Sequence, residues 1–183
     1  MEKMGFEGLL TIPNDIMWKG ELKEAFYCVK SDEWKFMVPG SNVLIELGPQ
    51  IVEDLLHLKN EGLLVPSDIS DADAESELVN SWKTTKFSAM EEILRTQNPD
   101  SDEWRSTFLI YTLSKYLAAA NKNGVQVHLF AAALLFKTSE MYNWAEYVWR
   151  VLQAGIEKFR KDKMPHYCGG CTHVLLVSML LLW

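Results

Sequence analysis

Residues 143–161 read NWAEYVWRVLQAGIEKFRK and carry the clearest helix signal in the chain. Asn143 and Glu146 stand three residues apart, the spacing of a capping box, in which side chains accept hydrogen bonds from backbone N–H groups at a helix start. The apolar residues then recur with a period close to 3.6: Trp144, Val148, Val151, Leu152, Gly155, Ile156 and Phe159. The stretch predicts an amphipathic helix that ends near Lys161.

Two further helices are predicted upstream of this one. Asp100 and Glu103 repeat the capping-box spacing, and an apolar face continues from them to about Asn121. Residues 125–136 (VQVHLFAAALLF) are apolar almost all round, which is typical of a central buried helix, although the first four also fit a strand. Short connections between three helices predict a helical bundle over residues 100–163. The side chains expected in its core are Trp104, Phe108, Leu113, Leu117, Leu129, Leu134, Trp144, Val148, Leu152 and Ile156.

The N-terminal part mixes short helices and strands. Residues 21–30 (ELKEAFYCVK) have helical apolar spacing, which predicts a short helix. Residues 34–38 and 42–47 are strand-like runs separated by a Pro-Gly-Ser turn, which predicts a hairpin. A helix is expected over 50–61, with Pro49 in its first turn and Gly62 as its left-handed end.

An acidic stretch separates this part from the bundle. Residues 67–77 (SDISDADAESE) hold five acids and no base, which indicates an exposed, mobile loop or linker. A calcium loop is not expected, because the stretch lacks the glycine and the final glutamate that such a loop requires. A further helix is expected over 82–97.

The fold class expected from these patterns is mainly α. We divide the chain into a small mixed α/β part over 1–66, an acidic exposed loop or linker over 67–80, a helical bundle over 81–163, and an uncharged tail with cysteine and histidine residues over 164–183.

Residues 50–65 (QIVEDLLHLKNEGLLV) resemble the third helix and following strand of winged-helix domains. The resemblance implies a winged-helix-like N-terminal part and, for that family, binding of nucleic acid. A DNA-reading helix carries Arg, Lys, Asn or Gln on its outer face, whereas this one carries Glu53, Asp54 and Glu61. The resemblance therefore favours protein binding.

The charge distribution also argues against nucleic-acid binding. The 183 residues carry 18 basic and 25 acidic side chains, and the first 100 residues hold 9 of the basic and 19 of the acidic ones. Such a surface repels phosphate. The basic residues of the second half gather at Lys158, Arg160, Lys161 and Lys163, which suits the negative pole at a helix end.

Motifs that name a reaction are missing from the sequence. It contains no Walker A loop, no dinucleotide-binding glycine pattern, no H-E-x-x-H and no G-x-S-x-G. His128 is expected to be a core histidine, and Cys28 a small buried hydrophobic residue. Three cysteines are an odd number and argue against a disulfide framework, which favours an intracellular, cytoplasmic location.

One compact cluster near the C-terminus has the residue types of a metal or redox site. His166, Cys168, Cys171 and His173 can form a Cys₂His₂ zinc set, and the two cysteines also have the spacing of a thiol-redox pair. A third alternative is that the cluster has no chemical role. We expect no cofactor, with zinc as the alternative.

The cluster opens a twenty-residue uncharged tail, 164–183. Only its last ten residues are strongly apolar, so docking of the tail onto the helices is favoured over a membrane anchor.

The function expected from all this is a non-enzymatic protein–protein interaction module of an adaptor or regulatory kind. Seven Trp, eight Phe and six Tyr supply side chains that are enriched at binding hot spots, although they also fill cores. The partner is expected to be another protein, a second copy of the chain being one option. The alternatives are a zinc-binding or thiol-redox protein and a winged-helix nucleic-acid binder.

Overall fold

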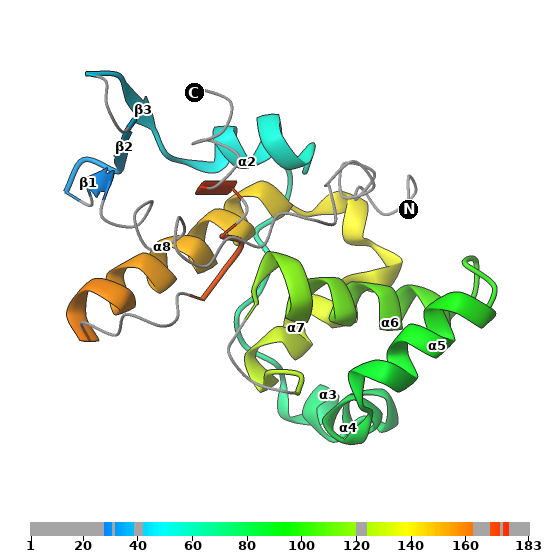
Figure 1. Cartoon of the computed structure of the whole chain (residues 1–183). Helices are drawn as coiled ribbons and strands as arrows, with labels where there is room; N and C mark the ends of the chain where they lie inside the picture. The colour runs from blue at the N-terminus through cyan, green and yellow to red at the C-terminus, as the bar shows by residue number, and fades with distance from the viewer. Residues whose placement is uncertain are drawn as a thin grey trace.

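The computed structural model describes residues 28–30, 32–38, 42–119, 124–162, 169–172 and 174–175. In this part the chain is mainly helical, with a small three-stranded antiparallel sheet near its N-terminal end (Figure 1). A mainly α protein with a small mixed N-terminal part was the expected fold class, and at that level it is confirmed.

The sheet consists of β1 (Val29–Lys30), β2 (Lys35–Met37) and β3 (Leu44–Glu46), in that order. Phe36 lies opposite Val29 on one side and Ile45 on the other, and Phe36 and Val29 are buried. The predicted hairpin is confirmed by the antiparallel pairing of β2 with β3. The helix predicted over 21–30 is wrong at its end, because the last two residues pair with β2; residues 21–27 lie outside the described part.

Helix α2 (Pro49–Leu56) has its proline in the first turn, as predicted, and packs against α8 (Trp144–Asp162). Its predicted end at Gly62 is wrong. His57 adopts a left-handed conformation (φ 50°) and donates its N–H to the Glu53 carbonyl at 2.8 Å. Histidine is among the residues enriched in this conformation, so the helix closes at His57, before any glycine is reached.

The acidic stretch is exposed as predicted, but part of it is helical. Helix α3 (Asp71–Ala74) and helix α4 (Glu77–Thr84) start within it. The hydroxyl oxygens of Ser70 and Ser76 accept hydrogen bonds from Asp73 N and Val79 N, which satisfies backbone donors at both helix starts.

The single helix predicted over 82–97 is wrong, because α4 ends at Thr84 and α5 (Phe87–Thr96) starts afresh. The hydroxyls of Thr84 and Thr85 both donate to the Ser81 carbonyl, at 3.1 and 2.7 Å. Hydroxyl bonds of this kind compete with the helix ladder, and β-branched residues are poor helix formers, so the chain breaks without a Gly or Pro.

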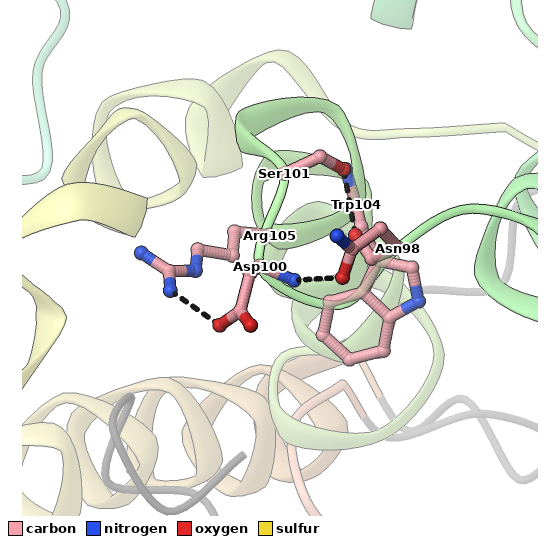
Figure 2. Close-up of polar contacts among 5 residues, drawn as sticks. All are labelled: Asn98, Asp100, Ser101, Trp104 and Arg105. Carbon is pink, nitrogen blue, oxygen red and sulfur yellow. Dashed lines mark hydrogen bonds and ion pairs between the residues drawn. The ribbon is translucent and has the colours of Figure 1, made fainter.

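Helix α6 (Asp102–Thr112) starts one residue later than predicted. Figure 2 shows why: Asn98 Oδ1 accepts a hydrogen bond from Asp100 N at 3.0 Å, which places Asp100 inside a turn. Ser101 is the cap instead, and its hydroxyl accepts from Trp104 N at 3.2 Å. Asp100 pairs with Arg105 (Figure 2).

The α6 ladder widens into a π-helix, η3 (Leu113–Leu117), in which Ala118 N bonds to Leu113 O. The prediction of one buried helix over 125–136 is right about burial but wrong about the type of helix. It is a chain of short pieces: η4 (Val127–Leu129), α7 (Phe130–Ala133), η5 (Leu134–Lys137) and, just beyond, η6 (Ser139–Met141). Leu129 to Ala133 are all buried.

Helix α8 (Trp144–Asp162) confirms the prediction made from residues 143–161, because Asn143 Oδ1 accepts from Glu146 N at 2.8 Å. Arg160 and Lys161 lie in its last turn, as the helix-end interpretation of the basic cluster requires. Nine of the ten predicted core residues are buried, and Leu134 is half-buried.

One continuous apolar cluster joins the sheet, α2, the helices after residue 79 and the described part of the tail. In the view of Figure 1 the sheet lies above α8 at the left, and α3 and α4 lie at the lower right. Within the described residues, every helix is too short or too polar to cross a bilayer.

Candidate functional site

Of the four residues of the predicted metal or redox cluster, Cys171 belongs to the described part of the chain. Cys171 is 1% exposed and belongs to the apolar cluster, where cysteine behaves as a small hydrophobic side chain. His166, Cys168 and His173 lie outside the described residues. Among the residues that the structure describes, no three His, Cys, Asp or Glu side chains gather into a metal-holding group.

The turn at Gly170, just before Cys171, packs closely against the backbone of α8. Gly170 has a positive φ of 94°, and its N–H donates to the Ala119 carbonyl at 3.0 Å. A Cβ at this position would stand 2.7 Å from Leu152 Cα, so the turn needs glycine for both conformation and space. Val174 and Leu175 are buried, as the docking prediction requires of them. Residues 176–183 are outside the described part.

The remaining histidine and cysteine expectations have mixed outcomes. His128 is exposed, so the expectation of a core histidine is wrong. The apolar face of its segment turns inward through Leu129 to Ala133, which leaves the residues just before them at the surface. Cys28 is half-buried and packs against the apolar cluster. His57 is exposed at the end of α2.

An exposed apolar surface lies where two distant segments meet. Leu63, Leu64 and Met141 are 54%, 60% and 51% exposed, and we refer to these three residues as the Leu63 patch. Leu63 N donates to the Met141 carbonyl at 2.9 Å, and Asn143 N donates to the Leu63 carbonyl at 2.8 Å. These two bonds join the chain after α2 to the residues just before α8.

Further contacts fix the same junction. Ala145 N donates to the Lys59 carbonyl at 3.1 Å, and Lys59 Nζ donates to the Glu140 carbonyl at 3.3 Å. Gly62 has a φ of 111°, and a Cβ there would stand 2.4 Å from the Met141 carbonyl oxygen. The patch is therefore held on ordered backbone, with its large side chains left in solvent.

A cleft opens a few residues further along the chain. It has a volume of about 520 Å³ and is lined by Ser67, Asp68, Ile69, Gln126, Val127 and His128. Ser67 Oγ donates to Asp68 Oδ2 at 3.0 Å, and Val127 is 64% exposed. Leu64 and Ser67 are three residues apart, so their Cα atoms lie within about 11 Å of each other. The cleft and the Leu63 patch are thus neighbours.

The rim of the cleft is acidic. Between residues 61 and 82 the chain carries six acids and no base, and all six are exposed. Of the two lysines that flank this stretch, Lys59 pairs with Glu61 at 3.5 Å, and Lys83 donates to the Ala74 carbonyl and to Asn80 Oδ1, at 3.1 and 2.8 Å. In the described part of the chain, no lysine or arginine pairs with the acids between 67 and 77.

A second surface cluster joins α5 to η3. Tyr111 OH donates to Glu91 Oε1 at 2.7 Å. The pKa of Tyr111 is raised mainly by burial and, to a smaller extent, by this hydrogen bond. Phe87 meets Tyr111 edge to face, and the Lys115 ammonium lies 4.1 Å from the Phe87 ring centroid. Each polar group in the cluster has a partner within it, so the cluster is a structural tie between two helices.

The η3 π-helix carries one orphan group. Ser114 Oγ is buried and has no hydrogen-bond partner. π-Helical turns often mark functional positions, but Ser114 does not line the cleft at residues 67–69 and 126–128.

Sequence reasoning found the exposed acids but missed the Leu63 patch and the cleft. The available signal was a pair of leucines between Gly62 and Pro66, which is too short for a core element. The resemblance to a winged-helix strand obscured it, because a strand would have paired these residues.

Comparison with known proteins places the chain in a family by sequence. The profile of the family described as "Domain of unknown function (DUF8566)" matches residues 1–176. No curated protein and no solved structure shows significant similarity to the chain.

Proposed function

We propose that this chain, which belongs to the DUF8566 family, is a non-enzymatic protein–protein interaction module that binds its partner through the Leu63 patch. The observation that carries the proposal is the combination of exposure and order in Leu63, Leu64 and Met141. Large apolar side chains exposed on a fixed backbone are typical of interaction sites, since binding then costs little conformational entropy.

The fixed geometry supports a docking role over a purely structural one. Leu63 uses both its backbone N–H and its carbonyl to hold the segment in place, so its side chain is not needed for that purpose. The three side chains lie outside the apolar cluster of the described residues, and exposed apolar side chains favour aggregation unless a partner covers them. A surface of this kind suits an adaptor or regulatory module.

Two finer features of the fold belong to this proposal. We infer that α6, the segment 127–141 and α8 form a helical bundle that supports the patch; α6 packs against α7 and η5, and α8 packs against α2. A winged-helix-like N-terminal part fits only in a protein-binding form, because α2 carries Asp54 on its exposed side. The odd cysteine count supports a cytoplasmic location.

The experiment compares two pairs of substitutions that place charge on exposed apolar positions. The test variant is Leu64→Glu with Met141→Glu, and the control is Met37→Glu with Val43→Glu on the hairpin. All four residues are between 42% and 60% exposed, so each variant is expected to fold. Thermal unfolding confirms the fold before binding is measured.

Each variant and the wild-type chain are used as baits in cell extract from the source organism, and captured proteins are quantified by mass spectrometry. The proposal predicts that at least one protein captured by the wild type and the hairpin control falls at least about tenfold with the patch variant. The same captured proteins at the same levels with all three baits would show that the Leu63 patch is not the docking surface.

A further inference from the structure

Two segments of the chain line the cleft beside the Leu63 patch, 67–69 and 126–128, and each supplies apolar and polar side chains. Ile69 and Val127 supply the apolar side chains, and Asp68, Gln126 and His128 supply polar ones. Val127 is 64% exposed, which makes it one of the most exposed large apolar residues in the described part of the chain. A cleft of about 520 Å³ has room for several side chains of a bound segment.

The backbone along one wall is unpaired. In the part of the chain that the structure describes, residues 64–69 take part in no backbone–backbone hydrogen bond. The first residue to do so on one side is Leu63, which bonds to Met141, and on the other side Ser70, which accepts from Ala74. An added peptide strand uses such C=O groups, and such N–H groups except at Pro66, which has none, for main-chain hydrogen bonds.

The acidic residues at and beside the cleft favour a positively charged ligand. Asp68 lines the cleft, and Asp71, Asp73 and Glu75 follow it on α3, all of them exposed. The two lysines that flank this stretch have other partners: Lys59 pairs with Glu61, and the ammonium of Lys83 is bonded to the Ala74 carbonyl. A segment that carries lysine or arginine therefore gains attraction here, and an acidic one is repelled.

We propose that a basic peptide segment of the partner protein binds along residues 64–69, with its backbone bonded to theirs, an apolar side chain against Ile69 and Val127, and its cations facing Asp68 and α3. This inference rests on the proposed function and names the chemistry of the partner. The Leu63 patch then forms one end of the interface, since Leu64 is also the first residue of the segment along which the peptide binds.

The test uses the full chain and three fluorescein-labelled peptides of about ten residues, long enough to run past residues 64–69 in extended form. Lysine alternates with valine and threonine in the basic peptide, glutamine replaces lysine in the neutral one, and glutamate replaces it in the acidic one. Affinity is measured by fluorescence anisotropy at low ionic strength and again at about 0.3 M salt, where exposed charges are screened.

A matched pair of variants separates local charge from net charge. The cleft variant is Asp68→Asn, Asp71→Asn and Glu75→Gln. The control removes three exposed carboxylates that lie outside residues 67–77: Asp54→Asn, Glu103→Gln and Glu157→Gln. Val127→Ser tests the apolar contact, and its exposure means that the fold does not depend on it.

We expect the basic peptide to bind at least about threefold tighter than the neutral one, with the advantage lost in high salt or in the cleft variant and kept in the control. Val127→Ser weakens the basic and neutral peptides alike. Equal binding of these two peptides, or an equal effect of both triple variants, would overturn the charge chemistry while leaving the Leu63 patch as a docking surface.

Two other outcomes would overturn the inference altogether. One is that no peptide binds, and the capture experiment on the Leu63 patch then decides the proposed function by itself. The other is that the chain self-associates in sedimentation velocity through the same three carboxylates, which would make the occupant a second copy with its basic α8 end.

Discussion

The junction that presents the Leu63 patch depends on one glycine, and Gly62→Ala is the sharpest perturbation of it. Gly62 has a φ of 111°, a conformation that costs a residue with a Cβ about 1–3 kcal/mol. The new Cβ would also stand 2.4 Å from the Met141 carbonyl oxygen and 3.1 Å from its carbon. Both atoms belong to the backbone, so the contact is not relieved by a change of rotamer.

The chain relieves the overlap only by moving residues 62–63 away from Met141. That movement breaks the bonds from Leu63 N to Met141 O and from Asn143 N to Leu63 O, each worth about 0.5–1.5 kcal/mol net. Movement releases part of the strain, so strain and lost bonds do not add fully. We expect unfolding free energy to fall by about 2–4 kcal/mol, a large share of the stability of an ordinary domain.

Urea denaturation followed by tryptophan fluorescence measures this loss, since Trp144 lies two residues after Tyr142 in the same junction. Gly124→Ala is the control, because a Cβ there meets nothing within 4 Å, and its expected effect is within about 0.5 kcal/mol. A Gly62→Ala chain as stable as the control would refute the reasoning that the junction is tightly held.

Three further predictions concern single side chains. Ser101→Ala is expected to cost about 0.5–2 kcal/mol in urea denaturation as a lost helix cap, and Asp100→Ala less, because its pair with Arg105 is exposed; the reverse order would restore Asp100 as the cap. Ser114→Ala is expected to be neutral or to stabilise by up to about 1 kcal/mol, since its buried hydroxyl has no partner, and a loss above that would reveal one. Burial raises the pKa of Tyr147 from 10.0 to about 12, so the folded state favours the neutral phenol. The stability gained in this way is complete below pH 10 and is lost as the pH rises to about 12. Tyr147→Phe should therefore flatten the fall of Tm over that range, and an unchanged slope would exclude this group as a source.

The parts of the fold that could be predicted are those in which local chemistry and tertiary packing agree. Helix α8 has a side-chain cap at Asn143 and a continuous apolar stripe, and both appear as predicted. The hairpin of β2 and β3 follows from a Pro-Gly turn between two apolar runs. Burial of Leu129 to Ala133 was also predictable, because exposing an apolar run of that length to water is unfavourable.

Other features depended on bonds that periodicity does not reveal. Hydroxyl bonds to the Ser81 carbonyl accompany the break between α4 and α5, and an Asn98 turn moves the α6 cap to Ser101. The 127–137 segment shows that an apolar pattern predicts burial but not the type of helix.

The Leu63 patch is the hardest case for sequence reasoning. Its residues come from positions almost 80 apart in the sequence and are brought together by backbone hydrogen bonds. A pattern of side chains in the sequence therefore does not predict the patch. The cleft likewise joins residues 67–69 to 126–128. The acidic wall was visible in sequence, because five acids without a base require solvent. Charge could thus be predicted, whereas the surface that it borders needed the three-dimensional structure.

The most direct test of the interaction function is site-specific photocrosslinking in cells. A benzophenone amino acid is placed at position 64 or 141 in the patch, and at position 37 as an exposed control on the hairpin. We expect irradiation to give the same discrete adduct from positions 64 and 141 and none from position 37. No adduct from the patch, or an equal one from position 37, would contradict the claim that the Leu63 patch binds a partner protein.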